Sequence, residues 1–387
     1  MELTHYLIPV DIDQFASKDF LHQRGSFGTS IDRFGIHSKV ENFNRYDLAI
    51  IGVTDERNTS NNGCSKSVLT IREQLYKLAR FDSQVKIIDL GNIMQGNTIN
   101  DTYFALKDVC SFLVEQEIIP IIIGGDQDYT LPLIKVFENS STDTNLVSVD
   151  PKFDFTQDLE PGDSTVYLNT IFTECNNTLY NVSCLGLQGY FMPPEQIDYF
   201  TLKGYDYLRL GEIRNNMEIV EPILRDADVV GFDISAIRAS DAGAHINMGP
   251  NGFYAEEACR LMRYAGISDR VKITGIFGIN PRLDPNNTTS MLTAQMIWYF
   301  IEGYINRMKD YPAIPLSNYL NYHVEVEEID FPLIFYRSQK SERWWVEISW
   351  SEKQDDKRVV SCTKEDYEIA GNNEVPETWW RNFRKKQ

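Results

Sequence analysis

Three acidic stretches contain the residues of this chain whose types and spacing suit chemistry. They are Gly124-Gly125-Asp126-Gln127-Asp128, Asp150-Pro151-Lys152-Phe153-Asp154 and Phe232-Asp233-Ile234-Ser235. Each stretch follows an apolar run that is typical of a buried strand. If the strand ends meet, three carboxylates from Asp150, Asp154 and Asp233 would suit a hard divalent cation such as Mg²⁺ or Mn²⁺.

The residues beside these carboxylates are poor ligands for a second cation. Gln127 and Ser235 offer neutral oxygens, and Lys152 offers no lone pair while it is charged. None of the five histidines lies in the three stretches. We therefore expect damaged metal chemistry, with the Lys152 ammonium in the place of a lost cation and paired with Asp150 and Asp233.

The elements that must position these residues alternate along most of the chain. Apolar runs predict strands over residues 46–53, 85–90, 118–123, 145–150, 182–187, 228–233 and 271–277. Amphipathic stretches between them predict helices over 66–80, 101–116, 130–138, 217–226, 254–265 and 289–308. This alternation predicts an α/β fold with a mainly parallel sheet, in which ligands bind beyond the carboxyl ends of the strands.

The two ends of the chain do not follow this alternation. We expect an irregular N-terminal lead-in over residues 1–45, an α/β domain over 46–310 and a β-containing C-terminal extension over 311–387. Five of the six tryptophans lie in the extension. The extension either packs as an appended β element on the main domain or forms a partner-binding surface, since Trp and Tyr dominate binding hot spots.

In order and spacing, the motifs resemble those of the arginase (ureohydrolase) superfamily over roughly residues 45–308. The resemblance rests on a GGDH-like stretch at 124–127, a DxHxD-like stretch at 150–154, an SxDxD-like stretch at 231–235, and Gly278-Ile279-Asn280-Pro281 in place of Glu-x-Asn-Pro. Residues 232–243 are most similar to the formimidoylglutamase branch. The resemblance implies a three-layer α/β/α fold and two Mn ions that serve hydrolysis of a C–N bond in guanidino, amidino or formimino substrates.

The resemblance also assigns expected roles to single positions. It implies that three metal ligands survive, namely Asp150, Asp154 and Asp233. It implies that a His, a second His and an Asp are replaced, respectively by Gln127, Lys152 and Ser235. Gly278 stands where the family has a Glu that contacts a guanidinium.

Further candidate pocket residues are Asp126, Asp241 and His245, and the polar stretch 240–253 suits a small amino-acid-like ligand. Two alternatives stay open from the residues alone. Asp126 and Asp128 could cap a helix that begins near Thr130. His245 could be an exposed loop residue.

These patterns favour a catalytically inactive pseudoenzyme that serves as a binding or scaffold subunit, with a protein partner or as a homo-oligomer and with no cofactor. The alternative is a metal-dependent hydrolase of linear amidines, formiminoglutamate- or arginine-like, that uses Mn²⁺ at an atypical or single-metal site. A third interpretation is a small-molecule sensor that keeps the pocket without turnover.

Composition excludes several other function classes. The formal net charge of −19 disfavours nucleic acid and anionic membrane surfaces, because both would repel the chain. No run approaches the ~18 apolar residues of a membrane span, so we expect no membrane insertion. No signal-peptide pattern is visible at the N-terminus, and the six cysteines lack a CxxC pair. We therefore expect free thiols in the cytoplasm.

Overall fold

A large sheet forms the centre of the molecule. The computed structural model describes residues 3–35, 43–139, 143–312, 316–350 and 357–385. The strands of this sheet are β1 (Leu7–Ile8), β2 (Asp32–Arg33), β3 (Leu48–Val53), β4 (Ile87–Ile93), β5 (Ile119–Gly124), β6 (Thr144–Val149), β7 (Leu179–Leu187), β8 (Asp206–Arg209), β9 (Val229–Asp233) and β10 (Ile273–Phe277). They are ordered β1-β4-β3-β5-β10-β9-β6-β7-β8, with β2 beside β4. Among these described strands only the β1–β4 pair is antiparallel, which confirms the mainly parallel sheet.

Helices cover both faces of the sheet, which makes the predicted three-layer α/β/α fold. One layer contains α2 (Ser67–Lys77), α7 (Leu210–Asn215), α8 (Val220–Asp226), α9 (Ala255–Ile267) and α10 (Thr288–Ile305). The other contains α3 (Ile99–Glu115), α4 (Thr130–Lys135), α5 (Tyr167–Glu174) and α6 (Pro194–Lys203). The central strands β3, β5 and β6 are buried along their whole length because both layers cover them. Each large apolar side chain buried there contributes about 1.5–3 kcal/mol of transfer free energy.

Local signals explain where the helices begin. Helix α3 starts at a capping box in which the Thr98 hydroxyl accepts from the Asp101 backbone and the Asp101 carboxylate accepts from the Thr98 backbone. These two bonds satisfy amide groups that have no partner within the helix. Its apolar residues recur every three or four positions, so a single face is buried.

The N-terminal lead-in differs from the irregular segment that we expected. Strands β1 and β2 both pair with β4 and extend the edge of the large sheet, and the short helix α1 (Phe27–Ser30) packs against α2. Sequence patterns also missed β8, α5, α6 and α7. Strand β8 is short and mixed in polarity, because an edge strand is less completely covered.

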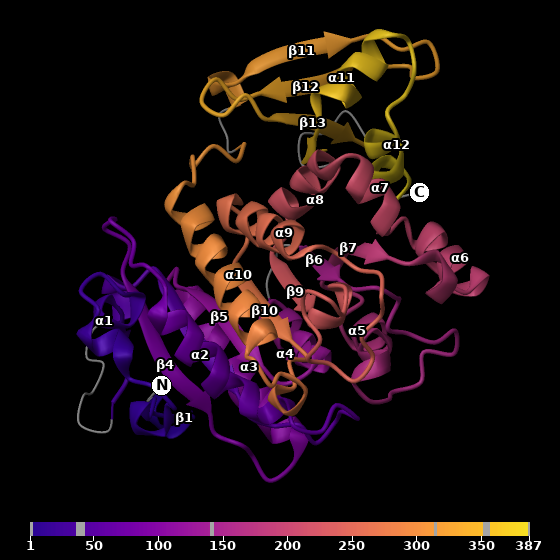
Figure 1. The fold of residues 1–387 in the computed structure, drawn as a ribbon. Coiled ribbons are helices and arrows are strands. Elements are labelled where there is room, and N and C mark those ends of the chain that lie inside the picture. The colour runs from indigo at the N-terminus through magenta and orange to yellow at the C-terminus, as the bar shows by residue number, and fades with distance from the viewer. Residues whose placement is uncertain (1–2, 36–42, 140–142, 313–315, 351–356, 386–387) are drawn as a thin grey trace.

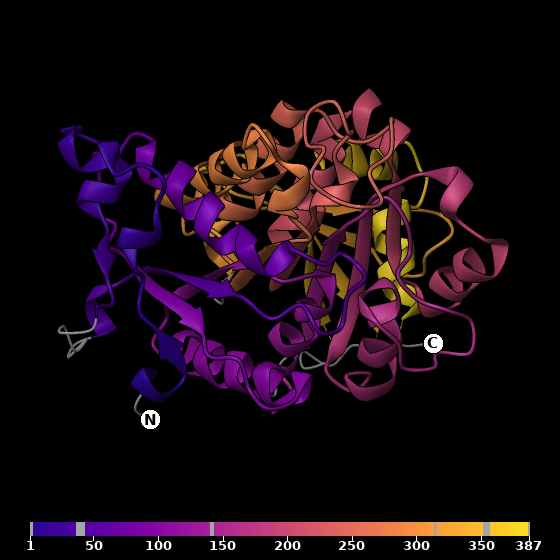
Figure 2. The same ribbon diagram turned by 60° about the horizontal axis from the view of Figure 1, so that its bottom comes forward.

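A smaller C-terminal unit, residues 316–385, carries its own antiparallel sheet. Strands β11 (Leu320–Val324), β12 (Leu333–Arg337), β13 (Trp344–Ser349) and β14 (Lys357–Cys362) pair in that order. Two helices accompany them, α11 (Lys364–Gly371) and α12 (Glu377–Arg384). This unit, orange to yellow in Figure 1, lies beside α7 and α8, and the indigo N-terminal elements lie on the other side of the molecule (Figures 1 and 2).

Aromatic and ionic contacts join the C-terminal unit to the main sheet. Trp345 is fully buried, and the guanidinium of Arg225 in α8 lies 4.5 Å from its ring centre. Arg225 also donates to the carbonyl oxygen of Cys362 at 3.0 Å, and Arg381 of α12 pairs with Asp206 of β8. These contacts support the interpretation that the extension packs on the main domain.

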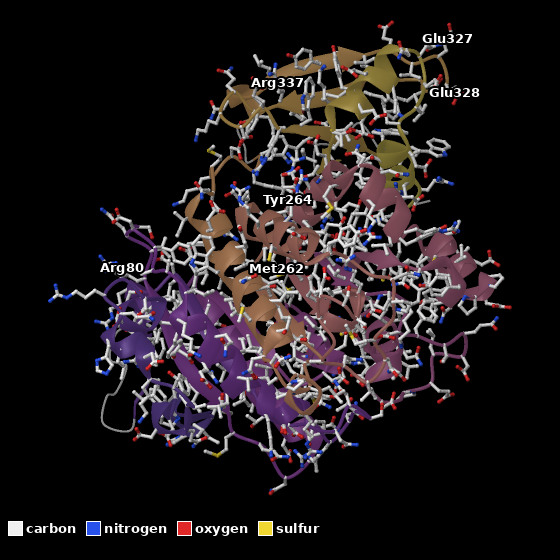
Figure 3. All side chains as sticks on the ribbon, viewed as in Figure 1. Arg80, Met262, Tyr264, Glu327, Glu328 and Arg337 are labelled. Atoms are coloured by element: carbon white, nitrogen blue, oxygen red, sulfur yellow. The ribbon has the colours of Figure 1, made fainter. Side chains whose placement is uncertain are left out.

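The surface is strongly charged. Charged side chains such as Arg80, Glu327 and Glu328 extend outward at the periphery, whereas Met262 lies inside the molecule (Figure 3). Over the described ranges, no helix has the length and apolar character that a bilayer crossing requires.

Candidate functional site

Four neighbouring strands bring the acidic stretches to one edge of the sheet. The strands β5, β10, β9 and β6 lie side by side, and the chain leaves their carboxyl ends at Gln127, Gly278, Asp233 and Asp150. In the parallel register, Phe277 lies opposite Asp233 and Phe232 lies opposite Val149. The strand ends therefore converge at the place where this class of sheet binds ligands.

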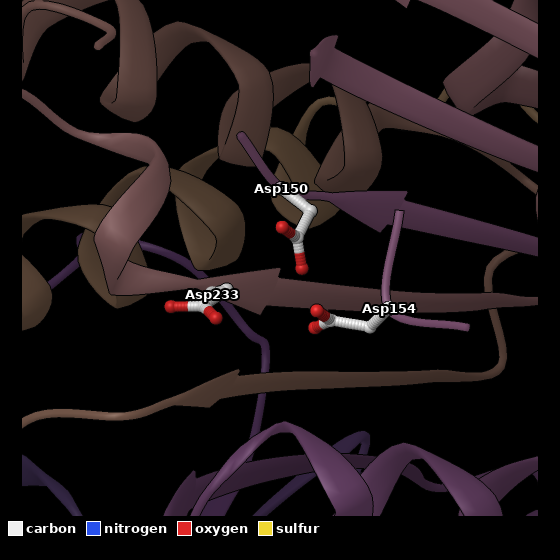
Figure 4. A group of neighbouring side chains, drawn as sticks. All are labelled: Asp150, Asp154 and Asp233. Atoms are coloured by element: carbon white, nitrogen blue, oxygen red, sulfur yellow. The ribbon is translucent and has the colours of Figure 1, made fainter. Parts of the chain in front are cut away.

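Three carboxylates meet at this edge. One oxygen from each of Asp150, Asp154 and Asp233 lies within 4.8 Å of the other two, and Figure 4 shows the three groups pointing toward one another. All three residues are at most 5% exposed. Burial raises the pKa of Asp150 and Asp233, and it raises the pKa of Asp154 to about 7. Such a cluster needs a nearby positive charge to hold all its carboxylates ionised.

Lys152 supplies one positive charge at the cluster. Its ammonium group pairs with Asp154 Oδ1, and its backbone N–H donates to Asp150 Oδ1 at 3.0 Å. Burial alone would lower the pKa of Lys152, but the charges of Asp154 and Asp150 raise it above its ordinary value. The expected side-chain pairing with Asp150 and Asp233 is therefore wrong. The ion pair that forms is with Asp154.

One end of the Gln127 amide is held by two hydroxyl groups. Its Nε2 donates to Ser148 Oγ at 3.3 Å and to Tyr167 Oη at 3.4 Å. Its Oε1 and the Oδ2 of Asp150 are both buried, and neither has a hydrogen-bond partner within the described part of the chain. Buried polar oxygens without partners are unusual in proteins. The three carboxylates fit one divalent cation with oxygen ligands, and Gln127 lines the same cavity as Asp154 and Asp233.

The residues at the second expected metal position do not fit a cation. Lys152 is a donor only. The backbone N–H of Ser235 donates to Asp233 Oδ1 at 2.7 Å, which occupies one of the oxygens that a second ion would share. The described residues therefore have carboxylate donors for one divalent cation, with an ammonium group beside them.

A cavity of about 370 Å³ opens onto this cluster. The sequence-predicted residues that line it are Asp126, Gln127, Lys152, Asp154, Asp233, Ser235 and His245. Phe191, Ile246 and Met248 add an apolar part to the wall, and Asn61 and Asn247 add neutral polar groups.

His245 is a buried residue of the cavity wall, with 8% of its surface exposed. The alternative of an exposed loop histidine is therefore wrong. Its Nδ1 accepts from the backbone N–H of Asn247 at 3.0 Å. A neutral His245 imidazole consequently carries its proton on Nε2.

The acids of the first stretch are held by side chains and do not cap a helix. Asp126 makes no side-chain cap bond; its Oδ2 accepts from the hydroxyls of Thr59 and of Ser164, the latter at 2.9 Å. The Oδ2 of Asp128 accepts from Tyr103 and Asn58. Burial, with the charge of Asp126, raises the pKa of Asp128 to about 8.

Gly278 has a backbone φ of +81°, which side chains other than glycine rarely adopt. A Cβ at this position would lie 3.0 Å from His245 Cδ2 and 3.3 Å from both Asp126 Oδ1 and Asp233 Oδ1. The carbonyl oxygen of Gly278 accepts from Asn61 Nδ2 at 2.7 Å. An acidic side chain at position 278 would crowd two carboxylates that already face this point.

Asp241 lies outside the described lining of the cavity, contrary to expectation. Its carboxylate pairs with Arg238 at 2.8 Å and accepts from the backbone N–H of Ala255 at 3.0 Å, at the start of α9. Its role in the structure is to hold the loop after β9 against that helix.

Sequence reasoning missed the hydroxyl groups of the site, which belong to Thr59, Ser148, Ser164 and Tyr167. Each is a single residue with no partner nearby in the chain, and Tyr167 begins a helix that we did not predict. No local pattern could have identified them.

The chain is similar to proteins of one known family. The model of the Arginase family matches residues 46–302. A formimidoylglutamase from Staphylococcus haemolyticus is 23% identical over 270 residues, which cover 66% of this chain and 85% of the relative. One from Bacillus subtilis is 20% identical over 311 residues, which cover 73% and 96%.

Solved structures show the same fold. The formimidoylglutamase of B. subtilis superposes with a TM-score of 0.65 at 18% identity, covering 77% of this chain and 97% of that one. The formiminoglutamase of Trypanosoma cruzi, solved with Mn²⁺, superposes with a TM-score of 0.62 at 18% identity, covering 70% and 97%.

One expectation must be corrected in this light. We expected no cofactor, and this expectation is contradicted by the manganese-containing structure of the T. cruzi protein. The replaced ligands at positions 127, 152 and 235 led to the error, because they suggested that both cation positions were lost. Three carboxylates, those of Asp150, Asp154 and Asp233, nevertheless converge in the structure.

Proposed function

Because this chain belongs to the arginase family, we propose that it hydrolyses a C–N bond of a linear amidine with one Mn²⁺ ion in its site. One observation carries this proposal: three buried carboxylates converge at the edge of the sheet, with one oxygen of each within 4.8 Å of the other two. The relatives with this fold are formimidoylglutamases, which supports the hydrolase alternative over the pseudoenzyme.

The ligands of the ion would be Asp150, Asp154, Asp233 and Gln127. All four offer oxygen, which suits Mn²⁺ as a hard cation. When bound, the ion would supply Lewis-acid chemistry, which activates water for attack on the amidine carbon. The Lys152 ammonium would supply the fixed positive charge beside it.

Asp126 is placed to bind the cationic end of the substrate. An amidine or guanidine is a cation at neutral pH, and it pairs best with a carboxylate. The Oδ2 of Asp126 is held by Thr59 and Ser164, whereas its Oδ1 faces the space beside Gly278. Asp126 therefore presents a carboxylate oxygen next to the position where the Cβ of the family's Glu would lie.

His245 is placed to hold a proton at the cavity wall. With Nδ1 accepting from the Asn247 backbone, the neutral ring presents an Nε2–H group, which can donate a hydrogen bond to the substrate. Hydrolysis adds water across the C–N bond, so the departing nitrogen gains its proton from the attacking water. We propose that His245 orients the substrate through this hydrogen bond.

The test is to load the purified protein with Mn²⁺, measure the bound metal and follow formiminoglutamate, arginine and agmatine by NMR. We expect about one Mn²⁺ per chain and cleavage of at least one of these compounds, lost on chelation and regained with Mn²⁺. Asp233→Asn should lose both metal and turnover. Asp241→Asn should keep both, since Asp241 lies outside the cavity lining.

A second candidate function is a catalytically inactive binding or scaffold subunit. The observation that favours it is the ammonium of Lys152 at the cluster, where the resemblance implies a second Mn²⁺ ion. Mn²⁺-loaded protein that cleaves none of the three compounds would contradict the hydrolase and favour this candidate. A homo-oligomer and a cytoplasmic location also remain proposals, the latter supported by six free, buried cysteines.

A further inference from the structure

The wall of the cavity changes in character from its inner end to its mouth. The acids Asp126, Asp154 and Asp233 at the inner end are at most 5% exposed. Two large apolar side chains of the same wall are far more open, with Phe191 48% and Ile246 45% exposed. A single exposed apolar side chain is ordinary, but several that line one cavity indicate a surface that receives a ligand. The mouth therefore offers an apolar surface, and the inner end offers negative charge.

Hydrogen bonds tie together the two loops that carry this apolar surface. Phe191 follows β7, whereas Ile246 lies in the loop after β9. Between these loops, Gln188 Nε2 donates to the carbonyl oxygen of Asn251 at 3.2 Å, and Asn251 Nδ2 donates to Tyr190 Oη at 3.3 Å. The rings of Tyr190 and Phe191 pack edge to face with their centres 4.7 Å apart. The apolar surface is therefore formed before a ligand arrives, which lowers the entropy cost of binding.

The described residues of the mouth include no cation for a substrate carboxylate. Within the described part of the chain, Lys152 is the only lysine or arginine on the cavity wall, and its ammonium group pairs with Asp154 at the inner end. The hydroxyl of Thr165, a polar group of the wall, donates to Asp163 Oδ1 at 2.6 Å, so a further acid lies beside the wall. A carboxylate at the mouth would lose water and meet like charge without gaining an ion pair.

The arginine of the loop after β9 is engaged elsewhere. The guanidinium of Arg238 pairs with Asp241 at 2.8 Å, and it lies 4.1 Å from the centre of the Tyr254 ring. Arg238 is outside the described lining of the cavity. It is therefore not placed to bind the far end of a substrate.

We propose that the site prefers an amidine or guanidine whose far end is an uncharged alkyl group over one that carries a carboxylate. The cationic end would lie at Asp126. The alkyl end would lie against Phe191, Ile246 and Met248. This inference rests on the proposed function, which places the cation at Asp126, and it replaces the amino-acid-like ligand that the stretch 240–253 suggested. The preference is one of affinity, so formiminoglutamate, arginine and agmatine still enter the site at higher concentration.

Three guanidines of equal length test the far end of the substrate. The chain ends in a methyl group in pentylguanidine, in an ammonium group in agmatine and in a carboxylate in guanidinovalerate. Calorimetric titration of the Mn²⁺-loaded protein gives the dissociation constants, and NMR of the same samples detects any product. We expect pentylguanidine to bind about 10-fold more tightly than guanidinovalerate and about 5-fold more tightly than agmatine, because a charged end loses water against an apolar wall.

A variant of the apolar surface separates contacts with the alkyl chain from general damage. Phe191→Ala should weaken the binding of pentylguanidine about 5–10-fold, because the chain loses an apolar partner. It should change the affinity for methylguanidine, which has no chain to reach the mouth, by less than about 2-fold. Phe104→Ala is the matched control, since Phe104 of α3 is 60% exposed and lies outside the described cavity wall. Thermal unfolding shows whether each variant is folded.

A second variant supplies the missing cation. Ile246→Arg should raise the affinity for guanidinovalerate about 10-fold, because a guanidinium pairs strongly with a carboxylate. Ile246→Gln, which adds a polar group without a charge, should not raise it.

Several results would overturn the inference. They are similar dissociation constants for the three guanidines, tightest binding of guanidinovalerate or agmatine, no binding of any of them, and equal losses for pentylguanidine and methylguanidine in folded Phe191→Ala. Failure of the proposed function is distinguishable, because tight binding of pentylguanidine without hydrolysis of any guanidine contradicts the hydrolase alone. Hydrolysis together with tightest binding of guanidinovalerate contradicts this inference alone.

Discussion

The ammonium group of Lys152 forms an ion pair with the carboxylate of Asp154 at the edge of the sheet where three acids converge. This relationship places a covalently attached cation beside a site that has oxygen ligands for one divalent ion. The fixed charge does not dissociate, so it offsets part of the repulsion within the cluster whether or not metal is present. The number of bound ions should therefore depend on Lys152.

Restoring ligands at the second position should raise the number of bound ions. We expect the double variant Lys152→His, Ser235→Asp to bind two Mn²⁺ per chain, because an imidazole and a carboxylate replace a donor-only side chain and a hydroxyl. Ser235→Asp alone should still bind one, since the ammonium remains. Metal analysis after removal of free Mn²⁺ gives the ratio. Two ions in the wild-type protein would contradict this account of Lys152.

The buried acid Asp128 should make stability depend on pH. Its pKa is about 8 in the folded chain, against about 3.9 for an ordinary Asp. Between these values the folded state holds a proton that the unfolded state lacks, so stability is lost as the pH rises toward 8.

Asp128→Asn removes this titration but keeps an oxygen that accepts from Tyr103 and Asn58. Relative to wild type, the variant should gain about 1–3 kcal/mol between pH 5 and pH 9. Urea unfolding at pH 5, 7 and 9 measures the difference, and Asp198→Asn, at an exposed position, controls for the loss of a charge. A difference that stays constant over this pH range would refute the prediction.

Substitution of Gly278 should be costly for two separate reasons. Its φ of +81° disfavours any side chain, and a Cβ would meet His245 Cδ2 at 3.0 Å. We expect Gly278→Ala to destabilise the fold by about 2–4 kcal/mol. Gly25→Ala is the control, because Gly25 has a φ of +96° and no atom within 4 Å of an added Cβ. Equal losses of unfolding free energy in the two variants would show that crowding at position 278 is unimportant.

The C-terminal unit should depend on Trp345 for its attachment. This side chain is fully buried and lies against the guanidinium of Arg225. Trp345→Ala should lower the free energy of unfolding by about 3–5 kcal/mol. Trp380→Ala, at a position that is 37% exposed, should cost less than about 1 kcal/mol. Denaturation followed by circular dichroism compares the two variants, and similar losses would contradict the assigned role of Trp345.

Much of the fold could be predicted because strands of a buried parallel sheet are apolar throughout. The stretches 46–53 and 118–123 correspond to β3 and β5, and the amphipathic stretch 289–308 corresponds to α10. Prediction failed where burial is incomplete, as in β8, and the two helices of the C-terminal unit, α11 and α12, were not expected. Edge strands and short helices have weaker patterns because less of their surface is covered.

The sequence alone placed Asp150, Asp154 and Asp233 at strand ends that had to meet, because parallel strands carry their carboxyl ends to one edge. It could not identify the hydrogen-bond and ion-pair partners of these residues or of the residues around them. Tyr167 reaches Gln127 across 40 positions, and Asn61 reaches Gly278 across 217. Tertiary structure decided that Lys152 pairs with Asp154, that Asp241 lies outside the cavity lining and that His245 lies in its wall. The physical reason is that strand formation depends on a local pattern of apolar residues, whereas a buried polar group takes its partner from whichever segment the fold packs against it.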